Sequence, residues 1–545
     1  MAVKSCRLLM IYPRFAAPSF WNYHDVCKVL GARYPTAPLS LITVAALLPP
    51  SWDVRLLDRN AEELTPADLD RADLVMTGGM MAQKTDTLDI IRICREQGKP
   101  VVVGGCDVTS SPHLYAEADF QVRGEAEGMM ETFVEAWTAG ERKGVFTSEK
   151  FTVDITQSPT PRFDLLNFSH YLYPGVQFSR GCPFTCEFCD IIELYGRVPR
   201  TKTNDQMLAE LDALYRLGYR GFVDFVDDNF IGNKKAIKRF LPALVNWQKE
   251  RGYPFEFSTE ATINLADDDE LLDLMRGANF FMIFVGIESP NTETLIAMQK
   301  KQNTRRSLSA SVNKIYKSGI VVKAGFIVGF DSEKLSVANE MIDCIESTSI
   351  PNCMVGLLAA LPTTQLTRRL AREGRLHSGY DNQGEAGGDQ GITGLNFETL
   401  RPRRDVYLDY ATILEKIYDR EAYFKRVRRM GRLIDRSNRA MSLSMRELLM
   451  VARLIWHMQV KQKGIRGSFW NTVLDCAIHN PRALKYVMIT MALYLHIGPF
   501  SRYVRAHTEE QIALIDTGEQ MESRLALPPV PSMRGSGGTL ATKAG

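Results

Sequence analysis

The sequence predicts an α/β protein with three units in chain order: a Rossmann-like domain, a partial (β/α)6 barrel and a helical C-terminal domain. Residues 1–150 alternate β-rich apolar stretches with helix-like ones, and residues 166–400 continue this alternation with a longer period. After about residue 400 the β signal fades and helical patterns remain. A chain of 545 residues is too long for one domain, which agrees with this division.

Composition narrows the function classes. The chain has 66 Lys and Arg against 64 Asp and Glu, so no overall charge favours nucleic-acid binding. It has no run of 18 apolar residues, and its start, MAVKSCRLLMIYP, lacks a signal-peptide cleavage site. We therefore expect a cytoplasmic protein that binds no nucleic acid. Ten cysteines are scattered apart from one group of three, which in the cytoplasm favours metal ligation over disulfides.

The first 150 residues have the pattern of a parallel sheet with helices on both faces. The strand-like stretches are CRLLMIYP, DVRLLDRN, DLVMTGG and PVVVGG, and the helix-like ones include LSLITVAALL and TDTLDIIRICREQG. Two strands end in glycine pairs, Gly78 with Gly79 and Gly104 with Gly105. Open α/β sheets bind ligands at the carboxyl ends of their strands, and glycine allows a ligand to approach the backbone. The alternative is that these glycine pairs form ordinary tight turns that bind no ligand.

The barrel begins after a predicted linker at residues 151–165, which is polar and contains proline. Its six strand candidates are GVQFSR, GFVDFVDD, FEFSTEA, FFMIFVGIES, VVKAGFIVGF and CMVGLLAALP. Six β/α units predict an open barrel, because a closed one has eight. Barrel enzymes carry their site at the carboxyl ends of the strands. The polar residues that follow these strands are Asp227, Asp228, Glu260, Glu288 and Asp331.

The helical C-terminal domain is predicted at residues 401–525. Its most apolar stretch, YVMITMALYLHIGPF, runs from Tyr486 to Phe500 and contains His496. We expect a buried helix there, with a membrane-surface helix as the alternative. Residues 526–545 are rich in Pro, Gly and Ser and are predicted to form a disordered tail.

The stretch SRGCPFTCEFCDII contains Cys182, Cys186 and Cys189 with the spacing C-x3-C-x2-C. Three thiolates can bind three corners of a cubane iron–sulfur cluster and leave one iron open for another ligand. Structural zinc is the alternative, but it takes four ligands, commonly as two separated pairs, and no second pair is present. The three cysteines also follow the first predicted barrel strand, at its carboxyl end.

This cysteine motif after the first strand of a partial barrel resembles the radical S-adenosylmethionine (SAM) superfamily, over residues 165–362. The resemblance implies a 4Fe-4S cluster on Cys182, Cys186 and Cys189, whose open iron binds SAM and supplies an electron that cleaves it to a 5′-deoxyadenosyl radical. It also places Phe188 near the adenine. The motifs FVDDNF, STEA and VGIES match later strands of that superfamily. The acids that they imply as SAM-binding residues are Asp227, Asp228, Glu260 and Glu288. Surface or helix-capping carboxylates are the alternative for each acid.

The first domain resembles the cobalamin-binding domain that precedes the barrel in B12-dependent radical SAM enzymes. The matching segments are APLSLITVAALLP, VRLLDRN, DLVMTGG, VVVGGCDVTSSP and VRGEAEG. The D-x-H-x-x-G motif, whose His ligates cobalt in related domains, is absent, so we expect no His below the cobalt; Met80, Met81 and Gln83 are candidates for that position. The residues implied for cobalamin binding are Thr77, Gly78, Gly79, Met80, Gly104, Gly105, Thr109, Gly124 and Glu125.

Longer segments resemble the hopanoid C-2 methylase group, among them RGCPFTCEFCDIIELYGRVPRTK and VDDNFIGNKKAIKRFL. The resemblance implies methylation of an unactivated sp3 carbon at C-2 of a hopanoid lipid. One SAM would supply the radical and a second would supply the methyl group through methylcobalamin. It also implies an electron donor such as ferredoxin or flavodoxin. The apolar and basic C-terminal region suits peripheral contact with the inner membrane surface, with a helical substrate lid as the alternative.

Two other functions remain open. One is a cobalamin-dependent radical SAM enzyme that acts on another substrate, or that catalyses cyclisation or rearrangement without methylation. The other is a non-catalytic corrinoid or iron–sulfur sensor. No catalytic residue is predicted beyond those that bind cofactors. Methylation requires cobalt and SAM to reach one substrate, so we expect the carboxyl-end faces of the two α/β domains to point at one another.

Overall fold

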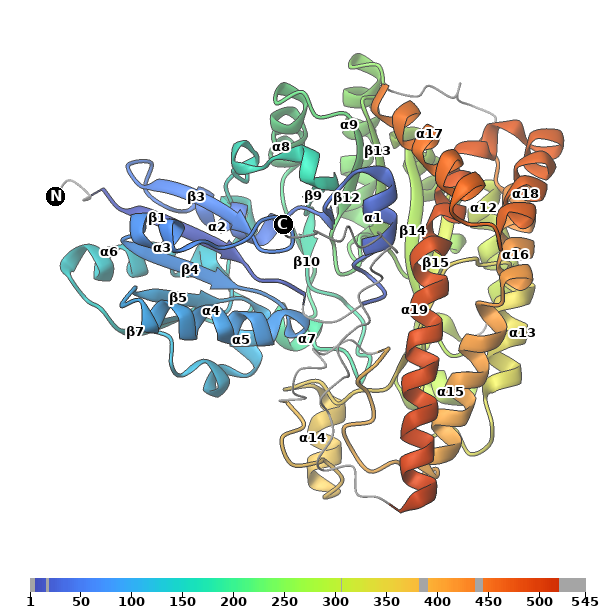
Figure 1. The fold of residues 1–545 in the computed structure, drawn as a ribbon. Coiled ribbons are helices and arrows are strands. Elements are labelled where there is room, and N and C mark those ends of the chain that lie inside the picture. The colour runs from blue at the N-terminus through green and yellow to red at the C-terminus, as the bar shows by residue number, and fades with distance from the viewer. Residues whose placement is uncertain (1–4, 16–18, 305, 382–390, 437–444, 519–545) are drawn as a thin grey trace, which may run out of the picture.

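Two parallel six-stranded sheets and a layer of long helices make up the protein (Figure 1). The structure is a computed structural model that describes residues 5–15, 19–304, 306–381, 391–436 and 445–518. The predicted disordered tail, residues 526–545, lies outside the described residues. Figure 1 shows the first sheet on one side, the second sheet in the middle and the C-terminal helices on the other side.

The first sheet has the strand order β3-β1-β4-β5-β6-β7, with every pair parallel. Its strands are β1 (Arg7–Tyr12), β3 (Asp53–Asp58), β4 (Leu74–Gly78), β5 (Val101–Gly104), β6 (Phe120–Arg123) and β7 (Gly144–Thr147). Its helices are α2 (Leu39–Ala46), α3 (Pro66–Arg71), α4 (Lys84–Glu96), α5 (Cys106–Ser110) and α6 (Met130–Ala139). The strand order reverses between β1 and β4, and ligands bind such sheets beside the reversal.

This sheet is covered on both faces, as the apolar runs predict. Successive residues of β1 alternate between two cores: Leu8 and Met10 belong to one, and Leu9 and Ile11 to the other. Neighbouring side chains on a strand point to opposite faces, so an apolar run requires helices on each side. The four strands proposed from sequence are confirmed, whereas β6 and β7 were not predicted.

The second sheet has the order β9-β12-β13-β14-β15-β16, again all parallel. Its strands are β9 (Gly175–Val176), β12 (Gly221–Phe225), β13 (Phe255–Glu260), β14 (Phe280–Glu288), β15 (Val321–Val328) and β16 (Cys353–Leu357). Its helices are α8 (Asn204–Arg216), α9 (Lys234–Glu250), α10 (Asp269–Ala278), α11 (Thr292–Ala297), α12 (Leu308–Lys317), α13 (Ala338–Thr348) and α14 (Gln365–Arg372). Within the described residues β9 and β16 do not pair, so the barrel is open, as predicted.

The two faces of the second sheet differ. Val223, Phe225 and Val285 point outward and are fully buried against the helices. Asp224 and Phe284 point inward and are only partly buried, although they lie on central strands. Side chains on an interior strand remain accessible only where the space in front of them is not filled. The inner face therefore surrounds a hollow, which we call the barrel chamber.

Two short strand pairs lie outside the sheets, and the first of them joins the two α/β units. β2 (Tyr34–Thr36) pairs with β8 (Tyr171–Tyr173), and β10 (Ser179–Arg180) pairs with β11 (Arg200–Thr201). Residues 151–165, predicted as a linker, contain two 3₁₀ turns, and Phe163 within them is buried in the core of the barrel. The connecting segment is therefore packed against its neighbours.

The C-terminal helices cover the outside of the barrel. They are α15 (Arg403–Ile417), α16 (Arg420–Leu433), α17 (Met445–Val460), α18 (Arg466–His479) and α19 (Leu484–Thr517). α19 packs on α15, α16, α18 and on α1 (His24–Leu30). By length and composition it could cross a membrane, but 78% of its most apolar window is buried in the protein. The expectation of a buried helix from Tyr486 to Phe500 is confirmed.

Candidate active site

The three cysteines lie on one irregular loop between β10 and a short helix, α7 (Ile191–Leu194). The loop begins at Gly181, whose φ is +94°, and a Cβ there would lie 2.9 Å from the carbonyl oxygen of Gly196. Cys182 donates its backbone N–H to that same carbonyl at 3.2 Å. A residue larger than glycine would separate these two segments, so the sequence RGC is needed for the loop to close.

The three thiols lie near one another, since Cys182 and Cys186 both act electrostatically on Cys189. All three cysteines are free thiols. Amide groups point at two of them: Asn229 Nδ2 lies 3.9 Å from Cys182 Sγ, and Gln302 Nε2 lies 3.8 Å from Cys186 Sγ. Across the described residues, no three His, Cys, Asp or Glu side chains are close enough to bind one metal ion. A cubane takes one thiolate at each of three irons, so this donor set fits a cluster better than zinc.

Two acids at the carboxyl end of β12 hold the loop in place. Asp227 is buried and accepts hydrogen bonds from the backbone N–H groups of Phe178 and Ser179, at 3.0 and 2.5 Å, and from the hydroxyl of Ser179. Asp228 accepts the N–H of Gly181 at 2.9 Å through one oxygen. Burial raises the pKa of Asp227 to about 7 and that of Asp228 to about 6. Both oxygens of Asp227 accept hydrogen bonds, whereas Asp228 has one oxygen to which no described residue donates.

The other two predicted acids differ in their surroundings. Glu260 ends β13 and is exposed to the barrel chamber. Its enclosure by protein, together with the neighbouring carboxylates, raises its pKa to about 8. Glu288 ends β14 with φ +66° and forms a buried ion pair with Lys300. The ring of Phe188 lies 5.9 Å from Lys300 Nζ, so Phe188, Glu288 and Lys300 form one group beside the cysteine loop.

The wall of the barrel chamber has apolar side chains beside a few charged ones. Glu260 and Phe284 are register partners on adjacent strands, as are Phe284 and Lys323, so these three side chains share the inner face. Trp21, from the N-terminal segment, meets Phe284 edge-on at 5.1 Å and is still 39% exposed. Val226 is also exposed on this side. The chamber therefore suits an apolar ligand that contacts few polar groups.

The predicted glycine turns of the first sheet pack against one another. A Cβ on Gly78 would collide with the carbonyl of Gly104, and one on Gly105 would lie 3.0 Å from the carbonyl of Gly79. The glycines thus bring the ends of β4 and β5 together, and Gly105 and Met80 remain exposed there.

Four other residues proposed for cobalamin occupy distinct positions. Thr77 is buried and donates to the carbonyl of Ile11 at 2.9 Å. Thr109 joins two turns, since it donates to Gly105 O at 2.7 Å and accepts the N–H of Gly124 at 2.9 Å. Glu125 is buried. The structure thus gathers these residues at one edge of the sheet, although Thr77 and Glu125 face protein groups.

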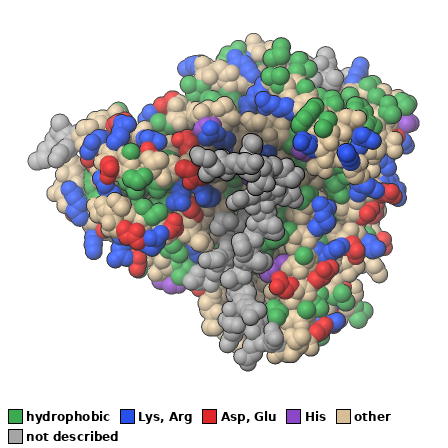
Figure 2. Space-filling model, in the orientation of Figure 1, with side chains coloured by type: hydrophobic (Ala, Val, Ile, Leu, Met, Phe, Trp, Pro, Cys, Tyr) green, Lys and Arg blue, Asp and Glu red, His purple; other side chains and the backbone are tan. Residues whose placement is uncertain are grey.

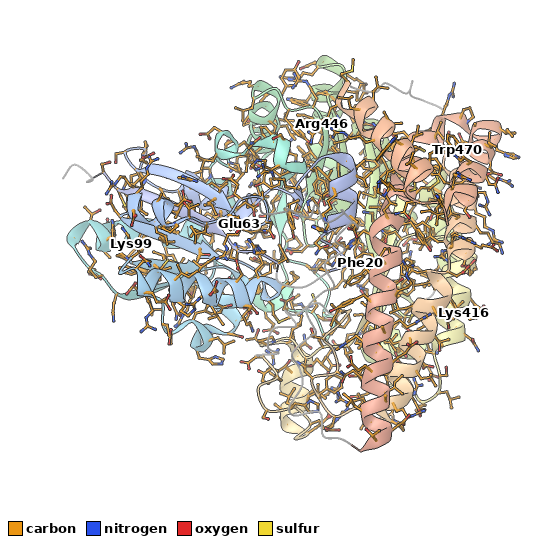
Figure 3. All side chains as sticks on the ribbon, in the orientation of Figure 1. Phe20, Glu63, Lys99, Lys416, Arg446 and Trp470 are labelled. Atoms are coloured by element: carbon orange, nitrogen blue, oxygen red, sulfur yellow. The ribbon has the colours of Figure 1, made fainter. Side chains whose placement is uncertain are left out.

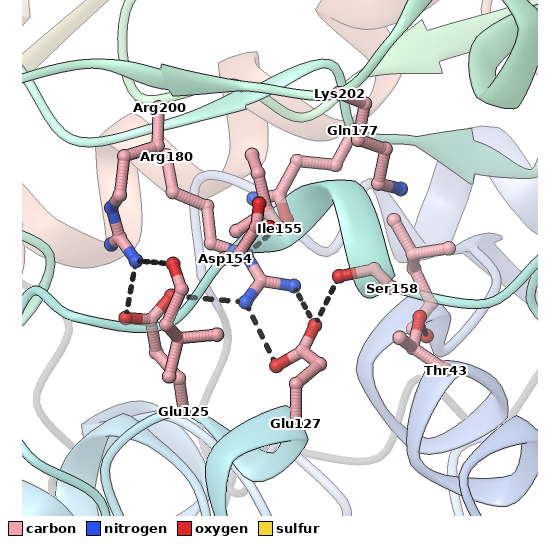
Figure 4. Close-up of polar contacts among 12 residues, drawn as sticks. Thr43, Glu125, Glu127, Asp154, Ile155, Ser158, Gln177, Arg180, Arg200 and Lys202 are labelled. Carbon is pink, nitrogen blue, oxygen red and sulfur yellow. Dashed lines mark hydrogen bonds and ion pairs between the residues drawn. The ribbon is translucent and has the colours of Figure 1, made fainter.

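The carboxyl ends of the two sheets face one another, as expected. Arg180, two residues before Cys182, reaches across to the loop after β6 (Figure 4). Its guanidinium donates to Glu125 Oε1 at 3.0 Å and to Glu127 at 3.0 and 2.7 Å. Arg200 donates to Glu125 Oε2 at 2.8 Å. In addition, α5, which follows β5, contacts α7, which follows the cysteines.

Sequence reasoning missed this group of charges. Arg180, Arg200 and Glu127 were not proposed, and Glu125 was proposed only as a cobalamin contact. The signal was present in RGEAEG and SRGC, two charged segments next to predicted site residues. Burial of Glu127 acts to raise its pKa. The hydrogen bonds and charge of Arg180 outweigh this effect and lower the pKa to about 2, so the pair is charged.

Comparison with known proteins now decides the family. Residues 176–345 match the radical SAM superfamily, and residues 364–510 match a domain of unknown function. A protein of Synechocystis named as an uncharacterized methyltransferase is 41% identical over 93% of this chain and 94% of its own length. The hopanoid C-2 methylase of Rhodopseudomonas palustris is 35% identical over 91% of this chain and 94% of its own length. The chain belongs to the radical SAM methyltransferase family.

Membership in this family makes the protein an enzyme, which rules out the sensor alternative, and it implies a 4Fe-4S cluster and SAM as cofactors. Two solved structures share the fold of this radical SAM methyltransferase. OxsB, determined with aqua-cobalamin, has a TM-score of 0.58 at 16% identity and covers 95% of this chain and 82% of its own. TsrM from Kitasatospora setae, with cobalamin and a [4Fe-4S] cluster, has a TM-score of 0.59 at 14% identity. The match covers 86% of this chain and 100% of the TsrM chain.

Proposed function

We propose that this protein is a B12-dependent radical SAM methyltransferase that methylates C-2 of a hopanoid lipid. The observation that supports the substrate is the 35% identity to a hopanoid C-2 methylase along nearly the whole of both chains. The apolar side chains of Trp21 and Phe284 in the wall of the barrel chamber agree with a hydrocarbon substrate.

The cofactor roles are assigned to residues by position. Cys182, Cys186 and Cys189 would bind the cluster. SAM would lie between this loop and the chamber, near the residues Phe188, Asp227, Asp228, Glu260 and Glu288. Asp227 acts there by holding the loop, because both of its oxygens accept hydrogen bonds from it. Asp228 has the free oxygen that could accept from an amino group.

Cobalamin would lie at the carboxyl edge of the first sheet. The exposed backbone at Gly105 and the exposed side chain of Met80 are the parts of that edge available to a large flat ligand. When bound, SAM on the cluster supplies a radical that removes hydrogen from carbon, and the corrinoid supplies the methyl group. The chain positions both groups around one substrate and keeps water away from it. A ferredoxin or flavodoxin would provide the electrons.

Lipid analysis tests the substrate. The gene is expressed in a hopanoid-producing bacterium that lacks the 2-methylated form, and extracted lipids are analysed by mass spectrometry. We expect a hopanoid heavier by one methylene, with the added methyl on C-2, and no such product from a Cys186→Ala variant. An unchanged hopanoid profile from a protein that carries its cluster would contradict the substrate. A product of altered structure without added mass would support cyclisation or rearrangement instead.

A further inference from the structure

Helices α17 and α18 expose an unusual number of large apolar side chains. In the described residues, 19 large hydrophobic side chains are exposed, and eight of these lie on these two helices. They are Met445, Leu448, Leu449, Trp456, Val460, Trp470, Leu474 and Ile478. Ile478 is 74% exposed and Trp456 is 56% exposed. Scattered single apolar residues are normal on a protein surface, but a contiguous group indicates a binding surface.

The group forms two adjacent stripes. On α17, Leu449, Trp456 and Val460 are spaced by seven and four residues, which places them along one side of the helix. On α18, Trp470, Leu474 and Ile478 follow at intervals of four. The indole N–H of Trp470 donates to Gln459 Oε1 of α17 at 2.8 Å, so the two stripes lie side by side. We call this surface the α17–α18 face.

Figure 2 shows hydrophobic side chains with lysines and arginines between them over the part of the molecule where α17 and α18 lie. Figure 3 places Trp470 at the outer side of this helical layer, away from the first sheet. Phe20 lies beside α19 in the interior. The face is therefore on the outside of the protein.

The charges around this face are positive. The turn between the helices carries Lys461, Lys463 and Arg466, all exposed, and Lys461 Nζ lies 5.8 Å from the ring centre of Trp456. The two acids between residues 445 and 479 are not exposed. Glu447 pairs with Lys485 at 2.7 Å, and Asp475 pairs with Arg432. Apolar side chains, two tryptophans and several exposed cations thus occupy one face.

We infer that the α17–α18 face docks the enzyme on the surface of an anionic lipid bilayer. Tryptophan and aliphatic side chains enter the boundary between headgroups and acyl chains, while nearby Lys and Arg bind lipid phosphates. A second copy of this chain is a poorer occupant, because a symmetric contact would bring the two cationic turns toward each other. The argument uses neither cofactors nor substrate, so the inference stands or falls separately from the proposed function.

The sequence pointed to a different segment for membrane contact. The stretch from Tyr486 to Phe500 was the alternative membrane-surface helix, but its side chains are buried beneath α15, α16 and α18. The exposed surface lies on the two preceding helices, whose mixed composition hid it from a search for apolar runs.

Vesicle co-sedimentation of the full-length protein tests the docking. We expect the protein to pellet with vesicles of phosphatidylglycerol and phosphatidylethanolamine, and much less with phosphatidylcholine alone. Tryptophan fluorescence should shift to shorter wavelength on binding. The Lys461→Gln, Lys463→Gln variant should bind about twentyfold more weakly, since each cation near an anionic surface contributes about fivefold. The Leu474→Ser, Ile478→Ser variant should lose at least about tenfold.

A matched control separates this face from general hydrophobicity. The Leu335→Ser, Leu408→Ser variant removes two exposed leucines outside α17 and α18, and it should bind vesicles like the wild type. Thermal unfolding confirms that each variant is folded. Equal vesicle binding by all variants would overturn the inference. So would failure of the wild type to bind vesicles, or a dimer in solution that the Leu474→Ser, Ile478→Ser change converts to monomer.

Discussion

Arg180 and Glu127 form a two-point ion pair between the two α/β units, with Nη2 2.7 Å from Oε1 and Nη1 3.0 Å from Oε2. Arg180 directly precedes Gly181 and the first cysteine, while Glu127 lies in the loop after β6. Both side chains are nearly buried. The pair therefore fixes the distance between the proposed corrinoid edge and the cluster loop. Hydrogen removal at the cluster loop and methyl transfer at the corrinoid edge must act on one substrate across this distance.

Replacing Arg180 by Lys should uncouple these two halves. Lysine keeps the charge but cannot donate to both oxygens of Glu127 and to Glu125 at once. We expect the cluster and SAM cleavage to remain, while methylated product falls by about tenfold or more because misplaced reactants react slowly. The measurement is the ratio of product to 5′-deoxyadenosine in one reaction.

Two further variants sharpen the Arg180 test. Arg7→Lys changes an exposed pair with Asp73 and should leave the product ratio unchanged. Arg180→Ala leaves the buried carboxylate of Glu127 without its main partner and should lower the free energy of unfolding by about 3–5 kcal/mol. If Arg180→Lys forms product and 5′-deoxyadenosine in the wild-type ratio, the pair has no role in positioning.

The cysteine loop gives a second prediction. Changing Cys182, Cys186 or Cys189 to Ala should remove the iron–sulfur absorbance and SAM cleavage together, because each cubane corner needs its thiolate. Corrinoid binding should survive, since those residues belong to the first sheet. Cys344→Ala, at a partly buried cysteine on α13, should keep the cluster. Persistence of the absorbance in an anaerobically prepared triple variant would show that the assignment is wrong.

Most of the fold follows from local patterns. All six barrel strands and four strands of the first sheet were predicted, because apolar runs such as VVKAGFIVGF are long and end in glycine or acidic residues. β6 and β7 were missed for physical reasons. β6 has the sequence FQVR, with two polar residues among four, and β7 lies at the sheet edge with alternate residues exposed, so neither strand forms a continuous apolar run.

The site was predicted less completely than the fold. The cysteine spacing is local, so a cluster site could be proposed there without a structure. Asp227 was identified as a site residue, but its bonds to Phe178 and Ser179 come from segments almost 50 residues away, so its structural role could not be seen. The ion pairs of Arg180 were hidden for the same reason, since their partners lie more than 50 residues earlier.

Glu260 makes a prediction about pH. Its pKa is raised from 4.5 to about 8 by enclosure and by neighbouring acids, so the folded state holds this proton more tightly than the unfolded chain does. The resulting stability is fully present below pH 4.5 and is lost as pH rises through 8. The unfolding temperature should therefore fall from pH 6 to pH 8.5, and Glu260→Gln should reduce that fall. The control is Glu293→Gln, which changes an exposed side chain on α11 and should have the same pH dependence as the wild type. An identical pH dependence in Glu260→Gln would show that Glu260 is ionised at neutral pH.

Isotope labelling separates the two proposed uses of SAM. One SAM would bind the cluster held by the three cysteines, and the methyl group of another would have to reach the corrinoid at the exposed edge beside Met80 and Gly105. With SAM deuterated on its methyl group, the product should carry deuterium, while the 5′-deoxyadenosine should not. With substrate deuterated at the reacting carbon, the deuterium should appear in 5′-deoxyadenosine instead. Because Arg180 holds the two carboxyl-end faces together, both transfers should occur at one carbon. A product methyl group without label from SAM, or 5′-deoxyadenosine without label from the substrate, would contradict the mechanism.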